Sequence, residues 1–409
     1  MARGLFLAVF IGLLPFVHGD VSWRDGGHLT AAAAGLGVPH PTGFPLYVVL
    51  GHLFSLIPLG TVPFRVALLS ALAVALATAL MFRLATDRGV GRAPALLAAL
   101  CFPACFVVWL NGTLAEVYAI NVALIAVVFT WLFQSAPRFR LAALVTGLSL
   151  GVHVTAPLLM AVAWVFSLSV HRRWRALPRM LPWGLFGAAI VVFIPLAAAR
   201  EPWVNWGDPS TLAGWWRHLT AASITDAFQG QMGGAAVDVD LHVVIWAERV
   251  GGVLYPLALA VAGLGAFLVR PRWLGGALLI ALGVELVFSV VINPMGQMDY
   301  QTAVPGAWLL ALLLALVWGS VPRVIRNPRV QLATVVACAL AVLSGHLMTR
   351  PGERGPDDMA GVTARALFAP LPPGATVFLT GDDLPSQILY LQGVEAFRLD
   401  LLPLVNQQL

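Results

Sequence analysis

The segment that follows the first apolar run carries residue types that could move a proton. Asp25 and His28 stand close together, His40 follows, and three prolines lie between residues 39 and 45. A carboxylate just outside a bilayer could take a proton from a substrate hydroxyl, while the prolines stiffen the loop. In a plainer interpretation, Asp25 only caps a helix and the prolines steer the loop along the membrane.

Glu116 is a second acid at the end of an apolar run, and Tyr118 follows it closely. A carboxylate at the edge of a bilayer is costly unless it is paired or hydrated. Glu116 therefore either holds an arginine, such as Arg65, or completes a site around Asp25. The three cysteines lie inside apolar runs, so the sequence indicates neither a disulfide nor a metal site.

These residues must be positioned by a chain that crosses a membrane many times. Hydrophobic residues make up 59% of the 409 residues and charged residues only 11%, which a soluble domain would not need for its core. Apolar runs of about 17 to 22 residues, long enough to cross roughly 30 Å of hydrocarbon as helices, recur along the chain. We expect eleven spans, at residues 4–18, 62–84, 93–110, 118–134, 139–152, 154–170, 181–199, 251–269, 274–292, 302–320 and 330–347.

The basic residues, all 24 of which are arginine, predict the orientation of the spans. Clusters of positive charge stay on the cytoplasmic side. They occupy alternate loops, at residues 83–92, 138–140, 172–179, 270–272 and 323–329. The Asp25 segment and the C-terminal tail are therefore predicted outside, and the net charge of +5 reflects topology, not nucleic-acid binding. The first run could instead be a signal peptide cleaved after Gly19, and residue 20 would still emerge outside.

The chain is predicted to have four parts. They are a helical module over 1–199 with a first outer loop at 19–61, a long outer loop over 200–250, further spans over 251–347, and a small outer module over 348–409. The first outer loop is expected to hold two surface helices, at 28–36 and 44–57. The long loop should hold an amphipathic helix at 211–220, and its tryptophans either wall a binding site or form an interfacial belt.

The tail pattern predicts a small α/β unit. We expect a strand at 375–380, a helix that is capped by Asp382 and Asp383 and runs through Leu391, and a second strand at 394–401. A unit of about 60 residues with few apolar positions must lean on another part of the protein to be stable.

Five stretches together resemble the signature of a bacterial multi-pass membrane family. They are Asp25–Tyr47, Leu114–Asn121, Gly147–Thr155, Asn205–Gly214 and Asp383–Ser386, in the family's order and over nearly the whole chain. The first is long and specific, whereas the others are short. The animal lumenal protein O-mannosyltransferase of plexin-type receptors is a member of this family. The resemblance implies a GT-C glycosyltransferase that takes a sugar from a polyprenyl phosphate and uses an acid in its first outer loop.

The resemblance also implies roles for residues of this chain. Asp25 would be the catalytic base, and Glu116 would complete its site. His153 stands where many related enzymes carry a lysine that contacts the donor phosphate, although a histidine there could instead bond helix-end carbonyls. The family usually has a glutamate in place of His28, so one acid of its motif is missing here.

Further candidate binding residues lie on the same predicted outer side of the membrane. Arginine binds phosphate bidentately, and three arginines lie beside or within the long outer loop: Arg200, Arg217 and Arg249. Substrate contacts are expected from His28, His40 and Tyr118. No cofactor is predicted, and a divalent metal ion would be compatible with the chemistry but has no support in the sequence.

Three classes of function compete for this pattern: a transferase, a transporter or flippase of lipid-linked saccharides, and a scaffold. Transporters usually place polar groups at the bilayer midplane, whereas here they gather at the outer boundary. A scaffold would not need an acid and two histidines on one side. The sequence therefore favours an all-α polytopic enzyme of the bacterial inner membrane, with about 11 transmembrane helices, a small α/β C-terminal segment and its active site on the periplasmic face. Its expected substrates are a polyprenyl-phosphate hexose, such as mannose, and a hydroxyl of an extracytoplasmic protein Ser or Thr or of a glycan, transferred with inversion.

Overall fold

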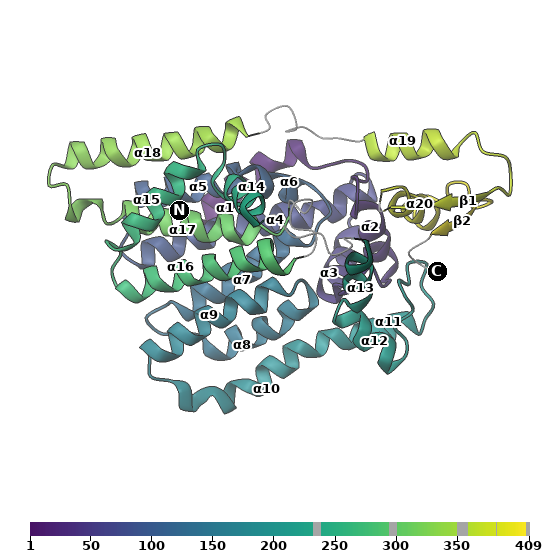
Figure 1. Ribbon diagram of the computed structural model, residues 1–409, viewed down its shortest axis with the longest axis horizontal. Helices are drawn as coiled ribbons and strands as arrows, with labels where there is room; N and C mark the ends of the chain where they lie inside the picture. Colours follow the sequence, from purple (N-terminus) through teal and green to yellow (C-terminus); the bar gives the residue numbers. More distant parts are fainter. Residues whose placement is uncertain (232–238, 294–300, 350–358, 382, 406–409) are drawn as a thin grey trace.

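The computed structural model describes residues 1–231, 239–293, 301–349, 359–381 and 383–405. Apolar helices lie side by side along the long axis of the molecule, and shorter helices gather with a small α/β module at one end (Figure 1). The N-terminus lies toward the opposite end. The all-α membrane fold with a small α/β C-terminal unit that the sequence predicts is therefore confirmed.

Every predicted span corresponds to a helix or to consecutive helices. These are α1 (Ala2–Leu13), α4 (Val62–Asp87), α5 (Arg92–Ala104) with α6 (Phe106–Thr113), α7 (Tyr118–Leu132), α8 (Phe139–Leu148), α9 (Thr155–Val170), α10 (Leu177–Ala188) with α11 (Phe193–Ala198), α15 (Tyr255–Ala266), α16 (Arg272–Val287), α17 (Val304–Trp318) and α18 (Pro328–Met348). Within the described ranges, five helices are long and apolar enough to cross a membrane, or up to seven if two bent pairs each count as one span. The bent pairs are α5 with α6, at 65°, and α14 (Val239–Gly251) with α15, at 83°. The total of eleven spans thus stays a prediction.

The core of the bundle is built around α17. All of its residues from Val304 to Trp318 are buried, as expected for a helix that is apolar on every side. The Trp308 indole donates to the Ala77 carbonyl at 3.0 Å, which joins α17 to α4. By contrast, α10 and α18 bury a small share of their surface, so they offer apolar faces to lipid.

The two surface helices predicted in the first outer loop are present. α2 spans Gly26–Gly35 and α3 spans Pro45–Ser55, joined by the proline-rich linker. In the long outer loop, α12 spans Leu212–Leu219 and is capped by Thr211, whose hydroxyl accepts from the Gly214 N–H at 3.1 Å. α13 follows at Ala222–Gln231.

The C-terminal module contains α19 (Met359–Phe368), β1 (Thr376–Leu379), α20 (Asp383–Gly393) and β2 (Leu402–Val405). The strands pair in parallel, with Thr376 opposite Leu402. The predicted second strand at 394–401 is wrong, because Ala396 and Arg398 have positive φ and form turns. The strand begins after those turns, and α19 was not predicted from the sequence.

As expected, the module leans on the rest of the protein. α20 packs on α2 so closely that a Cβ on Gly27 would lie 2.3 Å from the Ser386 carbonyl oxygen. Arg365 of α19 donates to the Asp20 carboxylate at 2.5 Å and also pairs with Glu395. The first outer loop and the module therefore lie at the same end of the molecule, which agrees with the ten spans predicted between them.

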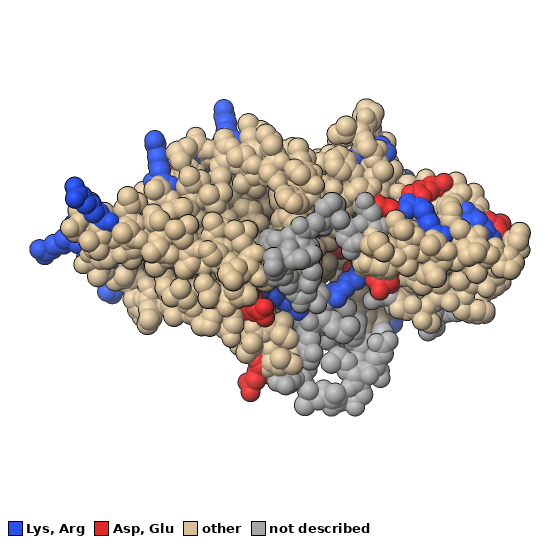
Figure 2. Space-filling model, turned by 90° about the horizontal axis from the view of Figure 1, so that it is seen from above, with Lys and Arg blue, Asp and Glu red and all other residues tan. Residues whose placement is uncertain are grey.

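Charge is distributed unevenly along the molecule. Figure 2 shows arginine side chains without acidic neighbours at the left end, and mixed acidic and basic side chains around the C-terminal module at the right. This asymmetry matches the prediction that arginine-rich loops face the cytoplasm while the module lies outside.

Candidate functional site

Asp25 occupies the N-cap position of α2, but its side chain does not cap the helix. Its backbone is helical, with φ −81° and ψ −15°, and its carboxylate makes no capping hydrogen bond. Asp25 Oδ1 lies 3.9 Å from His28 Nδ1, and the side chain is 31% exposed. A carboxylate that is not used to cap the helix and is open to solvent on one side can accept a proton from an incoming hydroxyl.

His28 and His40 meet beside Asp25. His28 Nε2 lies 2.6 Å from His40 Nδ1, and the two rings pack edge to face. The backbone N–H of His28 donates to Ser386 Oγ at 2.9 Å, and His28 Nδ1 lies 3.2 Å from the same oxygen. Burial, with a smaller contribution from His40, lowers the pKa of His28 well below its usual range, so its ring is neutral at pH 7.

Trp206 forms a wall over this pair of histidines. Its ring centroid lies 5.9 Å from that of His28 and 6.2 Å from that of His40. The backbone holds it there, because the Val38 N–H donates to Val204 and the Trp206 N–H donates to Val38. The start of the long loop is thus bound to the first loop, which favours the binding-wall interpretation for Trp206. Trp216, which is 67% exposed, fits the interfacial belt.

His218 of α12 closes the same region from another side. A Cβ on Gly43, which has a φ of +82°, would lie 3.0 Å from His218 Nε2. Burial, followed by the effect of His40, lowers the pKa of His218 to about 4. Three histidines, His28, His40 and His218, therefore surround the linker between α2 and α3.

Tyr47 lies where the charges of both Asp25 and Glu116 act on its phenol. Tyr47 is fully buried at the start of α3, and its hydroxyl has no hydrogen-bond partner among the residues that the structure describes. Burial, and then the negative charges of Glu116 and Asp25, raise the pKa of Tyr47 well above its usual range. Both carboxylates therefore act on one phenol. Glu116 itself is 1% exposed, in the loop between α6 and α7.

The Arg65 side chain has other partners. Its guanidinium donates to the backbone carbonyls of Ser55, Ile57 and Thr61. Arg65 therefore satisfies backbone carbonyls at the end of α3 and in the turn that follows it.

His153 belongs to a second polar cluster, which lies beside the first turn of α3. Its Nδ1 accepts from the Thr155 N–H at 3.3 Å and lies 2.8 Å from Thr155 Oγ1, and that oxygen accepts from the Asn121 amide at 2.8 Å. The Tyr118 ring lies 5.1 Å from the His153 ring. The preceding turn packs against α3, because a Cβ on Gly151 would lie 3.0 Å from the Leu46 nitrogen. Both clusters therefore adjoin the start of α3.

The three arginine candidates are not gathered at one point. Arg200 donates to the Leu36 carbonyl at 3.4 Å, so it lies beside the end of α2. Arg217 pairs with Asp226 at 3.2 Å on the exposed face of α12 and α13. Arg249 lies in the last turn of α14, and its carbonyl accepts from Cys105 at the bend between α5 and α6. Arg200 is thus the one placed against the Asp25 loop.

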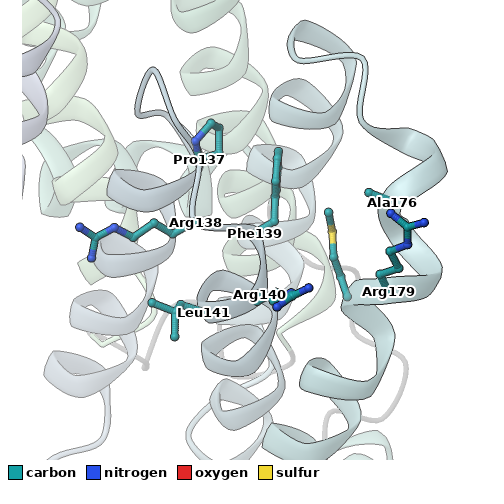
Figure 3. Close-up of a pocket in the computed structure, with 8 residues that line it drawn as sticks. Pro137, Arg138, Phe139, Arg140, Leu141, Ala176 and Arg179 are labelled. Atoms are coloured by element: carbon teal, nitrogen blue, oxygen red, sulfur yellow. The ribbon is translucent and has the colours of Figure 1, made fainter.

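A separate cavity of about 460 Å³ lies at the far end of α8. Figure 3 shows Phe139, Arg140 and Arg179 among the residues that line it. α8 begins at this cavity and leads toward Gly151, which contacts Leu46. The cavity is therefore remote from Asp25 and belongs to the arginine-rich end of the molecule.

Sequence reasoning found Asp25, His28 and His40 but missed the residues that complete their surroundings. Tyr47 is the last residue of the first family-like stretch, and Ser386 is the last residue of the final one. The resemblance could therefore have pointed to both residues as part of the site. His218 had no such signal, because nothing local indicates that α12 folds against the linker at Gly43.

The chain matches known proteins over its N-terminal part. Residues 25–177 match the N-terminal domain of protein O-mannosyl-transferase TMEM260. The protein O-mannosyl-transferase TMEM260 of Mus musculus is 32% identical over 229 residues, which is 52% of this chain and 32% of the mouse protein. This chain thus spans about a third of the length of that relative. The resemblance inferred from the sequence is confirmed.

The fold matches over almost the whole chain. ArnT from Cupriavidus metallidurans bound to undecaprenyl phosphate has a TM-score of 0.56 at 13% identity, covering 98% of this chain and 88% of ArnT. The apo form of ArnT gives 0.58 at 14% identity, covering 98% and 89%. The protein therefore has the GT-C-like fold that the family resemblance implied.

Proposed function

We propose that this protein is a membrane glycosyltransferase that moves a sugar from a polyprenyl phosphate to a hydroxyl outside the cytoplasm. The expected setting is the periplasmic face of a bacterial inner membrane. The donor sugar would be mannose or another hexose, and the acceptor a protein Ser or Thr or a glycan. The match to the TMEM260 domain and the ArnT-like fold support this class of reaction.

One observation carries the proposal. Asp25 stands at the start of α2 without capping it, and lies beside two histidines and an aromatic wall that come from separate parts of the chain. A capping residue would not need these neighbours. A general base needs an open approach, a fixed position and nearby groups that hold the substrate.

In the proposed reaction, Asp25 takes the proton of the acceptor hydroxyl while its oxygen attacks the anomeric carbon. The bond from that carbon to the phosphate oxygen breaks, and the phosphate leaves with the electron pair. A single displacement inverts the anomeric configuration. Phosphate is a good leaving group, so no dedicated acid is required. Glu116, buried near the shared Tyr47, would keep the site polar and orient the acceptor through that phenol.

The donor phosphate is assigned to the side of His153. His153 lies at the N-terminal end of α9, where helix N–H groups also favour an anion. Arg200, beside the end of α2, could reach the same phosphate from the long loop, with Arg217 and Arg249 as further candidates. Positive groups at this point would stabilise charge that develops as the phosphate departs.

Substrate contacts are assigned to His28, His40 and Tyr118. The first two offer ring nitrogens beside Asp25, and Trp206 offers an aromatic face on which a sugar or an acceptor side chain can stack. Tyr118 lies against His153 and would contact the donor end.

A reconstituted assay tests the proposal. Purified protein in proteoliposomes receives polyprenyl-phosphate mannose, glucose or galactose together with acceptor peptides or glycans, and mass spectrometry follows the sugar. Transfer from at least one donor is expected. Movement of the intact lipid-linked sugar between leaflets, with no transfer from any donor, would instead identify a flippase.

A further inference from the structure

Three side chains at the outer end of the bundle lie close enough together to bind one metal ion. Asp25, His28 and His40 each offer one ligand atom, and these atoms lie within 4.8 Å of one another. Two imidazoles and a carboxylate are a donor set for first-row transition metals, whereas Mg²⁺ and Ca²⁺ prefer oxygen ligands alone. Asp25 and His28 lie at the start of α2, and His40 lies in the linker that precedes α3.

The surroundings of His28 determine which ring nitrogen faces His40. Ser386 Oγ lies 3.2 Å from Nδ1, on the far side of the ring from Nε2. When Nδ1 carries the proton and donates to Ser386, Nε2 presents its lone pair toward His40. Metal-bound histidines usually have such a partner on the second nitrogen, because it fixes both the tautomer and the ring orientation.

We propose that Asp25, His28 and His40 form a binding site for a divalent transition-metal ion, for which Zn²⁺ is the reference probe. Zinc binds imidazole nitrogen at about 2.0–2.1 Å, so two such nitrogens lie about 3.3 Å apart in a tetrahedral site. His28 Nε2 and His40 Nδ1 are 2.6 Å apart, so the rings need to separate by less than about 1 Å. His40 is half-buried and lies on the linker, which makes it the ring that moves.

The site would be open on one side. His28 is 3% exposed and closes the inner face, whereas Asp25 and His40 are only partly buried. Three protein ligands leave further coordination positions, as in catalytic zinc sites. One carboxylate and a divalent ion give a net charge of +1, so the open position suits an oxygen of a substrate. This site rests on the proposed function only in that both use Asp25. One carboxylate oxygen of Asp25 would bind the ion, and the other would stay available to the acceptor hydroxyl.

Metal binding can be measured without any assay of sugar transfer. The full-length protein, stripped with a chelator and dialysed in detergent, is titrated with Zn²⁺ by calorimetry, and metal content is measured after gel filtration. We expect one Zn²⁺ per chain. His40→Ala should weaken binding by about 100-fold or more, and Ser386→Ala by about 10- to 100-fold, the usual effect of removing an outer partner.

Controls separate this site from adventitious binding. His52→Ala removes a histidine of α3 that bonds the Ala33 and Ala34 carbonyls, and it should leave Zn²⁺ affinity unchanged. Mg²⁺ should not compete. His40 is the main test because it is half-buried, so its loss spares the fold better than loss of the buried His28.

Two results would overturn the metal site: no stoichiometric Zn²⁺ in the wild type, or the same affinity in His40→Ala and in the wild type. In that case the two histidines form a hydrogen-bonded pair and nothing more. Sugar transfer by the stripped protein would leave the proposed function standing without the ion. Stoichiometric Zn²⁺ with no transfer from any donor would leave the site standing without the proposed function.

Discussion

At the scale of single residues, the outer end of this protein holds two polar clusters with different character. Around Asp25, His28 and His218 are buried and burial lowers their pKa values, so these two rings offer no positive charge to a phosphate. Around His153, the polar groups are arranged at a helix N-terminus, which favours an anion. This difference supports acceptor chemistry at Asp25 and donor binding at His153.

If His153 binds the donor phosphate, loss of its side chain should impair the use of the lipid donor selectively. His153→Ala should lower kcat/KM for the lipid donor by one to two orders of magnitude, since a hydrogen bond to a charged group is worth about 1.5–3 kcal/mol. His153→Lys should restore part of that loss. Kinetics at varied donor concentration measure the effect.

The same helix offers a matched control for this experiment. His171 follows the C-terminal end of α9 on the arginine-rich side, so His171→Ala should leave donor kinetics unchanged. An unaltered donor efficiency in His153→Ala would move the phosphate site to Arg200, Arg217 or Arg249.

At the scale of elements, the contact between α2 and α20 sets the back wall of the Asp25 site. α20 reaches His28 through Ser386, and it reaches the segment before α2 through Gln387, whose amide donates to the Ser22 carbonyl at 2.7 Å. The long loop contacts the same helix, because the Trp203 indole donates to the Leu389 carbonyl at 2.9 Å. The C-terminal module therefore positions the first outer loop, although the two lie far apart in sequence.

Glycine substitutions in α2 test this contact. Gly27→Ala should destabilise the protein by about 1–3 kcal/mol and reduce sugar transfer, because its Cβ would meet the Ser386 backbone at 2.3 Å. Gly35→Ala, in the same helix, meets nothing within 4 Å and should be nearly neutral. Thermal unfolding in detergent compares them. Equal melting temperatures for the two variants would mean that α20 does not pack on α2 in this way.

The elements were more predictable than their contacts. Apolar runs predicted most helices of the bundle but not α14, and Pro45 and Thr211 marked the starts of α3 and α12. The second strand of the tail was misplaced because its apolar residues extend through turns at Ala396 and Arg398. The approach of Ser386 and His218 to the histidine pair could not be predicted, because it depends on packing between distant segments.

At the scale of the whole molecule, charge and contacts indicate one functional face. The first loop, the start of the long loop and the C-terminal module touch one another, and arginine clusters lie at the other end (Figure 2). This arrangement suits a donor that presents its phosphate at the outer leaflet and an acceptor that arrives from outside the cytoplasm.

Reporter fusions test this topology. Alkaline phosphatase fused after Gly43 or after Leu371 should be active, since both positions are predicted outside, and a fusion after Arg173 should be inactive. Fluorescent-protein fusions should give the opposite pattern. Inactive phosphatase at Gly43 and Leu371 would place the Asp25 site in the cytoplasm and remove the basis for an extracytoplasmic acceptor.

The central claim is that Asp25 is the base of a sugar transfer, and the turnover of Asp25→Asn tests it most directly. The amide keeps the shape of the side chain but cannot take the acceptor's proton, so transfer should fall by about 10² to 10⁴ while the protein stays folded and inserted. Asp87→Asn is the matched control, because that acid is 47% exposed in a surface ion pair with Arg83 at the arginine-rich end and should keep wild-type activity. Wild-type turnover in Asp25→Asn would contradict the account and leave Asp25 as a structural residue of the loop.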